Sequence, residues 1–98
     1  MINNTLNLAA DLIERRGWAQ RPLAKRGDGL SPSEAPFCLV EALAEVEPSP
    51  HPYMGAVMAL ADRLGGTGMM PSAWNDQPGR TQAEVVELLR STADALAN

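Results

Sequence analysis

The sequence has few aromatic residues, one cysteine and one histidine. Aromatic residues make up 4% of the 98 residues, whereas hydrophobic residues make up 45%, so the core must be aliphatic. A lone cysteine, Cys38, cannot form an internal disulfide. One Cys, one His and scattered carboxylates match neither zinc-ligand spacing nor a calcium loop. We therefore expect no bound metal and no cofactor.

Long apolar runs are also missing. No stretch approaches the roughly 18 to 20 apolar residues that a membrane-spanning helix needs. A cationic start followed by an apolar signal stretch is not found either, and a single cysteine suits a reducing compartment. These features predict a soluble, cytoplasmic protein with no membrane partner.

Basic residues are absent from a long part of the chain. Five of the eight Lys and Arg residues lie between positions 15 and 26, and none lies between 27 and 61, while the net charge is -4. A basic end and an acidic end could orient a charged partner, or the two faces could simply be solvated. The basic segment, with Trp18 as a stacking platform, could touch nucleic acid. Because the chain as a whole is acidic, we do not expect a nucleic-acid partner.

Helical periodicity is the main structural signal in the sequence. It predicts an all-α fold, a compact four-helix single domain that covers residues 1–98 and has irregular connecting loops. The expected helices are 5–16, from 33–36 to 47, 52–64, and from 81 or 82 to 97, with one possible helical turn at 72–75.

Residues 20–36 form an unusually long connection between two of these helices. Arg21-Pro22, Gly27-Asp28-Gly29 and Ser31-Pro32 are turn signals. A strand pair around 27–29 is conceivable, although the flanking residues do not alternate well. Connections longer than about 12 to 15 residues are often functional or disordered.

The segment from Trp74 to Glu84 is the most specific part of the sequence. Thr81 followed by Glu84 predicts a capping box at the start of the last helix. Asp76 can accept turn hydrogen bonds or pair with Arg80, while Trp74 fills the core below. Alternatively, the tryptophans and Arg80 anchor a partner, because Trp and Arg dominate interface hot spots.

Cys38 is the best enzymatic candidate, because a thiol in the first turn of a helix can be drawn toward the thiolate. His51 with Asn75 or Asp76 could complete a nucleophilic set. However, Cys38 lies within an apolar run, which is more typical of a buried cysteine. The glycine-rich stretch at 65–68 lacks the residues of a phosphate loop and is better interpreted as a helix end.

Three motifs mark a resemblance that covers nearly the whole chain. They are Gly17-Trp18-Ala19-Gln20, then Phe37-Cys38-Leu39 with Ala42-Leu43, then Ala73-Trp74-Asn75-Asp76 with Gly79-Arg80-Thr81 and Glu84-Val85. The sequence resembles a family of small proteins of unknown function from bacteria, particularly actinobacteria, and their phages. Glu41 departs from that pattern, where glycine is more usual. The resemblance implies a compact, mainly helical domain and no assigned activity.

Two functional hypotheses follow from these observations. The first is a non-enzymatic acidic protein-binding module. It would be a phage or mobile-element accessory protein that occupies a surface of a host protein and so inhibits the defence of the host. The second is a thiol-dependent enzyme centred on Cys38. The first hypothesis assigns no catalytic residues. The expected protein-binding residues are Trp18, Glu41, Glu45, Trp74, Asn75, Asp76 and Arg80.

Overall fold

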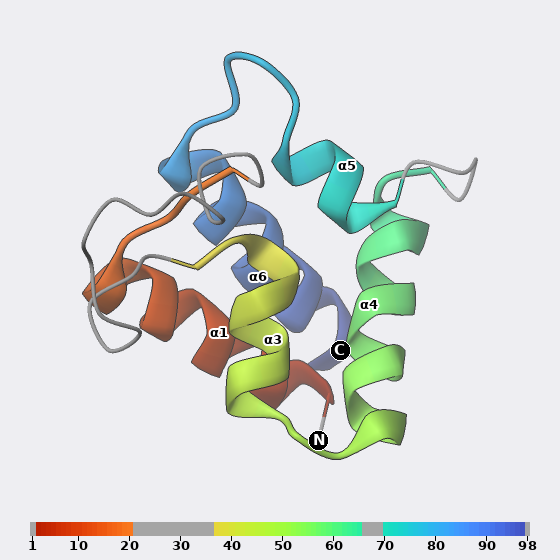
Figure 1. Cartoon of the computed structure of the whole chain (residues 1–98). Helices are drawn as coiled ribbons and strands as arrows, with labels where there is room; N and C mark the ends of the chain where they lie inside the picture. The colour runs from red at the N-terminus through yellow and green to blue at the C-terminus, as the bar shows by residue number, and fades with distance from the viewer. Residues whose placement is uncertain (1, 21–36, 66–69, 98) are drawn as a thin grey trace.

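Helices make up most of the chain that the structure describes. The computed structural model describes residues 2–20, 37–65 and 70–97 (Figure 1). Within these ranges there is no β-strand, and the all-α prediction is confirmed. Four longer helices and one short helix are present: α1 (Ile2–Arg16), α3 (Leu39–Val46), α4 (Pro50–Arg63), α5 (Pro71–Asn75) and α6 (Gln82–Ala97).

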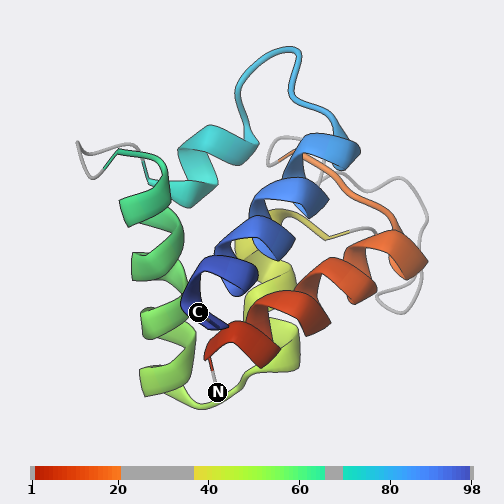
Figure 2. The same cartoon turned by 180° about the vertical axis from the view of Figure 1, so that it is seen from behind.

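Helices α1 and α6 form the most extensive helix pair. Both are amphipathic, and they lie side by side in both views of the molecule (Figure 2). Arg90 of α6 donates to Asp11 at 2.8 Å and to Glu14 at 2.6 Å, both on α1. These hydrogen bonds, first that to Asp11, raise the pKa of Arg90 above its ordinary value.

The hydrophobic core is aliphatic, as the composition predicts. Helices α3 and α4 cover it from the other side, and α1 packs against both of them. Gly55 of α4 allows the start of α1 to approach closely, because a Cβ there would lie 2.7 Å from Ile2 Cδ1. The fully buried large apolar side chains are Leu6, Ile13, Leu39, Leu43, Leu60, Val85 and Leu89.

Two helices start earlier than predicted. Helix α1 begins at Ile2 instead of Thr5, so Asn3 and Asn4 lie inside the helix. Helix α4 begins at Pro50 instead of Pro52. The N–H groups in the first turn of a helix have no partner within the helix, so a proline, which has no N–H, is tolerated there. Pro50 and Pro52 therefore both fit in the first turn of α4.

Helix α3 is shorter than predicted at its start. It begins at Leu39, Cys38 is its N-cap, and Phe37 is paired with Trp18 in an isolated parallel bridge. The start that we expected at 33–36 lies outside the described residues, as do the possible strand pair at 27–29 and most of the glycine-rich stretch.

Gly17 ends α1 as expected. Its φ of 96° is accessible mainly to glycine, and its N–H donates to Ile13 O at 2.7 Å. The chain then turns back, and Trp18 packs partly buried against the core. This end of α1 thereby brings residues 18–20 toward α5. None of the described helices has the length and apolar character that crossing a membrane requires.

Candidate functional site

Three of the residues predicted to form the site meet around one buried carboxamide. Asn75, the last residue of α5, is 0% exposed. Its Oδ1 accepts hydrogen bonds from Trp18 Nε1 at 2.5 Å and from the Leu39 N–H at 3.0 Å. Its Nδ2 donates to Ala19 O at 3.3 Å and to Asp76 Oδ1 at 3.0 Å. These bonds use both donors and both lone pairs of the carboxamide. We call this arrangement the Asn75 clasp.

The Asn75 clasp joins three separate parts of the chain. Gln20 Nε2 donates to the main-chain oxygens of Asn75 at 3.3 Å and Gln77 at 2.7 Å. The Ala19 N–H donates to Phe37 O at 3.1 Å, so residues 18–20 are held to the start of α3 as well as to α5. A buried polar group is costly unless it is paired, and here the pairing itself holds the segments together.

Trp74 and Arg80 also lie together, but they contact each other. The Arg80 guanidinium carbon lies 3.8 Å from the centroid of the Trp74 ring, a cation–π contact. Arg80 Nε donates to Trp74 O at 3.0 Å, and its Nη2 donates to Gln77 Oε1. The Arg80 side chain is 16% exposed, and Glu84 lies 3.7 Å from its Nη1. Arg80 therefore closes the turn that follows α5 over the half-buried Trp74 ring.

The predicted capping box is present at the start of α6. The Glu84 N–H donates to Thr81 Oγ1 at 3.2 Å, and the Thr81 N–H donates to Glu84 Oε1 at 2.9 Å. Both side chains thus pair main-chain donors that the first turn of a helix leaves without partners.

Glu41 and Glu45 lie one turn apart on α3 and have different surroundings. Glu41 Oε1 accepts a hydrogen bond from the Cys38 N–H at 3.0 Å, so this carboxylate helps to start the helix. Glu45 is exposed. The structure therefore gives Glu41 a local structural role, while Glu45 presents its charge to solvent.

Cys38 and His51 lie at opposite ends of α3. Cys38 is 0% exposed at the N-cap, whereas His51 is exposed in the first turn of α4. The eight residues of α3 lie between them, about 12 Å at a rise of roughly 1.5 Å per residue. Asn75 accepts a hydrogen bond from the Leu39 N–H, so this member of the proposed thiol set lies near Cys38, the residue before Leu39. Cysteine and histidine are not brought together.

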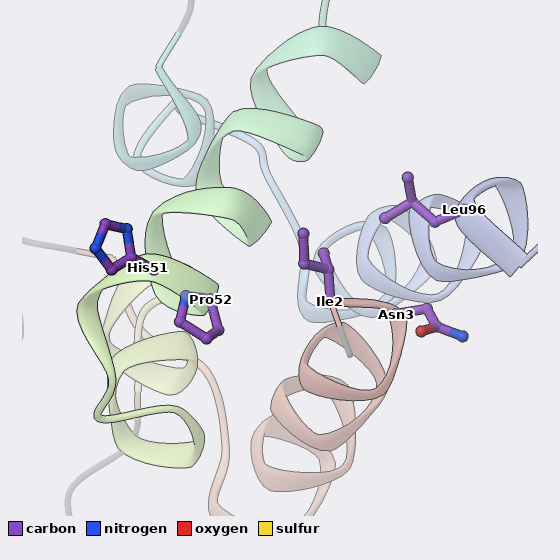
Figure 3. A pocket seen from close by; sticks show the side chains of 5 residues that line it. All are labelled: Ile2, Asn3, His51, Pro52 and Leu96. Atoms are coloured by element: carbon purple, nitrogen blue, oxygen red, sulfur yellow. The ribbon is translucent and has the colours of Figure 1, made fainter.

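An apolar hollow lies where the first turns of α1 and α4 meet the last turn of α6 (Figure 3). Its volume is about 500 Å³, and its walls are Ile2, Asn3, His51, Pro52 and Leu96. In the view Ile2 stands between Pro52 of α4 and Leu96 of α6, and Leu96 is 48% exposed. A smaller hollow of about 240 Å³ lies on the other side of Leu96, between α4 and α6. Both hollows are open to solvent at the surface.

Methionine side chains are exposed on α4. Met54 and Met58 are 48% and 63% exposed. They are spaced one helical turn apart on the side of α4 opposite its buried residues Ala56, Val57 and Leu60. No group of His, Cys, Asp and Glu able to hold a metal ion occurs within residues 2–20, 37–65 and 70–97.

A family model matches residues 2–95. The chain belongs to DUF6197, a family of unknown function. This match confirms that the sequence resembles a family without an assigned activity. None of the curated proteins and none of the solved structures compared with it matches the chain.

Sequence reasoning missed several contacts of this DUF6197 member. It did not find Gln20, Gln77 or Phe37, which hold the Asn75 clasp across long sequence separations. It also did not single out Met54 and Met58, which lie beside the apolar stripe of α4 and are exposed. Their position off that stripe is the signal that could have marked them as exposed.

Proposed function

We propose that this chain is a non-enzymatic protein-binding module that acts on a partner protein with a basic surface. The observation that carries the proposal is the charge of the surface. Ten Asp and Glu residues and five Arg residues lie in the described ranges. Three of the arginines are engaged within the fold: Arg16 over the Phe37 ring, Arg80 over Trp74, and Arg90 with two carboxylates of α1. These arginines keep their positive charge, and the described ranges still carry an excess of five acidic residues, which favours encounter with a basic partner.

The residues that serve this function have two kinds of role. Glu45, with Glu41 one turn before it, supplies negative charge on α3. Trp18, Trp74, Asp76 and Arg80 supply half-buried aromatic and polar groups near the end of α5, which suit the centre of an interface. Asn75 has no exposed surface, so it contributes by holding Trp18 and the start of α3 in place.

The setting of the proposal is a phage or mobile element that acts in the bacterial cytoplasm. A small acidic domain can occupy a site on a host protein that otherwise holds nucleic acid, and so block host defence. The acidic surface and the resemblance to small proteins of bacteria and phages support this setting. The partner is then a protein, and neither nucleic acid nor a cofactor takes part.

Affinity capture from host lysate at several salt concentrations tests the proposal. We expect reproducible recovery of a basic protein at low salt and weaker recovery as salt screens the charges. Glu45→Lys should reduce the recovery, while Glu87→Lys makes the same charge change at an exposed position on α6 and should preserve it. If no protein is recovered reproducibly at any salt concentration, the proposal fails.

Trp74→Ala separates docking from architecture at the end of α5. If Trp74 anchors the partner, the variant keeps its melting temperature and loses the captured protein. A large fall in melting temperature would instead show that Trp74 serves only the fold, because the ring supports Arg80 and packs against the core.

The alternative function is a thiol-dependent enzyme centred on Cys38. The position of Cys38 at the start of α3, beside the bond between Leu39 and Asn75, favours it. Complete burial and the distance to His51 oppose it. We expect a thiol reagent to modify Cys38 only after the protein unfolds, and rapid modification of the native protein would favour the enzyme.

A further inference from the structure

We infer that the exposed side of α3 and α4 docks a cationic amphipathic helix of the partner protein. This inference rests on the proposed function and names the element of the partner that binds. The surface consists of Glu45 on α3 and Met54, Met58 and Asp62 on α4, and we call it the α3–α4 face. Helices α3 and α4 are consecutive and pack against each other (Figure 1).

Met54 and Met58 supply the apolar part of the α3–α4 face. They are among the few large hydrophobic side chains that are exposed in the described chain, at 48% and 63%. Their Cβ atoms are about 5 to 6 Å apart, as for any pair one helical turn apart. Two neighbouring thioether side chains can adapt to aliphatic or aromatic anchors of different shape, a property of methionine-rich binding surfaces.

Charge selects the partner of this surface. From Phe37 to Asp62 the chain contains no Lys or Arg, and four carboxylates lie in the same range. Glu45 is exposed on α3, and Asp62 is exposed one turn beyond Met58. Glu41 and Glu47 add negative charge while they accept hydrogen bonds within the fold. The other titratable or charged groups of α4 are His51 and Tyr53 in its first turn and Arg63 at its end.

The spacing fits a helix of the partner. Met54 and Asp62 are eight residues apart, about 12 Å along α4, so the apolar pair and the carboxylate span a little over two turns. A helix with aliphatic anchors one turn apart could pack these anchors against the methionines. Its flanking Lys or Arg side chains could then pair with the carboxylates. A second copy of this chain would instead place carboxylates against carboxylates, which is unfavourable. The hollow that Asp62 helps to line between α4 and α6 includes neither methionine, so a small molecule bound there would not cover them.

The test uses a synthetic peptide of about 18 residues, long enough to span α4, in which Leu and Lys are arranged to form an amphipathic helix. Its control is a peptide of the same composition in scrambled order, and fluorescence anisotropy of a label on the peptide measures binding. We expect the amphipathic peptide to bind about tenfold more tightly than the scrambled one, because only the first presents its anchors on one side.

Two pairs of variants locate the binding surface. Met54→Gln with Met58→Gln should weaken binding of the amphipathic peptide about tenfold, whereas Leu8→Gln with Met70→Gln changes exposed apolar residues elsewhere and should not. Asp62→Lys should weaken binding, whereas Glu87→Lys on α6 should not, because only Asp62 borders the methionines. Circular dichroism verifies that each variant is folded.

Three results would overturn the inference. The first is equal binding of the two peptides, and the second is unchanged binding by the Met54/Met58 variant. The third is a dimer of the unbound protein, found by sedimentation, that dissociates in the Met54/Met58 variant. A partner that is still captured by the Met54/Met58 variant leaves the proposed function intact and rejects this surface. Failure to capture any protein with the unaltered chain rejects the proposed function itself.

Discussion

The Asn75 clasp and the α3–α4 face differ in where they place side chains that lie outside the apolar core. The clasp buries a polar group, whereas the α3–α4 face exposes apolar groups to solvent. In the clasp, a buried carboxamide has all its bonding capacity used by Trp18, Leu39, Ala19 and Asp76. On the α3–α4 face, two methionines remain exposed beside carboxylates. A group whose partners are all within the chain stabilises the fold. An exposed apolar pair gains burial only from another molecule.

The comparison also separates the residues expected to bind a partner. Trp18 and Asn75 are bonded to each other and hold the end of α5 to residues 18–20, and Arg80 closes the turn that follows α5. Glu45 is exposed on α3. Substitutions in the first group should change the free energy of unfolding, and substitutions on the α3–α4 face should change binding.

Asn75→Ala should have the largest effect on stability. It removes four hydrogen bonds and leaves the Trp18 Nε1 and Leu39 N–H donors without their acceptor, at about 1 to 3 kcal/mol for each buried group. We expect a loss of about 3 kcal/mol or more in urea unfolding, which is a large part of the stability of a small domain. Asn4→Ala, at an exposed position, is the control. A loss below about 1 kcal/mol would show that the clasp does not hold the fold.

Arg80→Ala should have the next largest effect. The substitution removes a cation–π contact and the hydrogen bond to Trp74 O, so we expect a loss of about 1 to 2 kcal/mol. Tryptophan fluorescence should also shift, because the Trp74 ring loses its cover. Arg15→Ala removes an exposed arginine and should leave both quantities unchanged. Equal stability of the two variants would contradict the role of Arg80.

Thr81→Ala should have a smaller effect, about 1 kcal/mol, because it removes the side-chain acceptor for the Glu84 N–H. Thr81→Ser keeps the hydroxyl and is the matched control. Thermal unfolding followed by circular dichroism measures both variants. Equal melting temperatures of the alanine and serine variants would show that the capping box does not stabilise the fold.

Met54→Gln with Met58→Gln should have the smallest effect on stability, within about 0.5 kcal/mol, because both side chains are already exposed. Leu60→Ala on the buried side of the same helix is the comparator, with an expected loss of about 2 to 5 kcal/mol. Urea unfolding measures both. A large loss in the methionine variant would show that these side chains support the fold, and the contrast with the clasp would disappear.

Much of the helical architecture could be predicted from local sequence. The periodicity of Leu6, Ile13, Val85 and Leu89 identifies the α1 and α6 stripes, and Thr81 with Glu84 identifies the start of α6. The start of α3 was less accessible, because Phe37 is held extended by Trp18, a residue far away in the sequence. No local pattern could have revealed that pairing.

The candidate site shows the same limit. The turn segment could be recognised as specific, and Arg80 and Trp74 do lie together. The burial of Asn75 could not be predicted, because an Asn at the end of a short helix is usually solvated. The exposure of Met54 and Met58 also depends on which side of α4 meets α1 and α3.

The sequence by itself determined an aliphatic, all-α chain with acidic excess, a helix stop at Gly17 and a capping box before α6. These properties depend on composition or on residues within about four positions of each other. Only the tertiary structure decided that Asn75 joins Leu39 and Trp18, across 36 and 57 positions, and that Met54 and Met58 face solvent. Burial and hydrogen-bond pairing are properties of packed segments, so they arise only when distant parts of the chain meet.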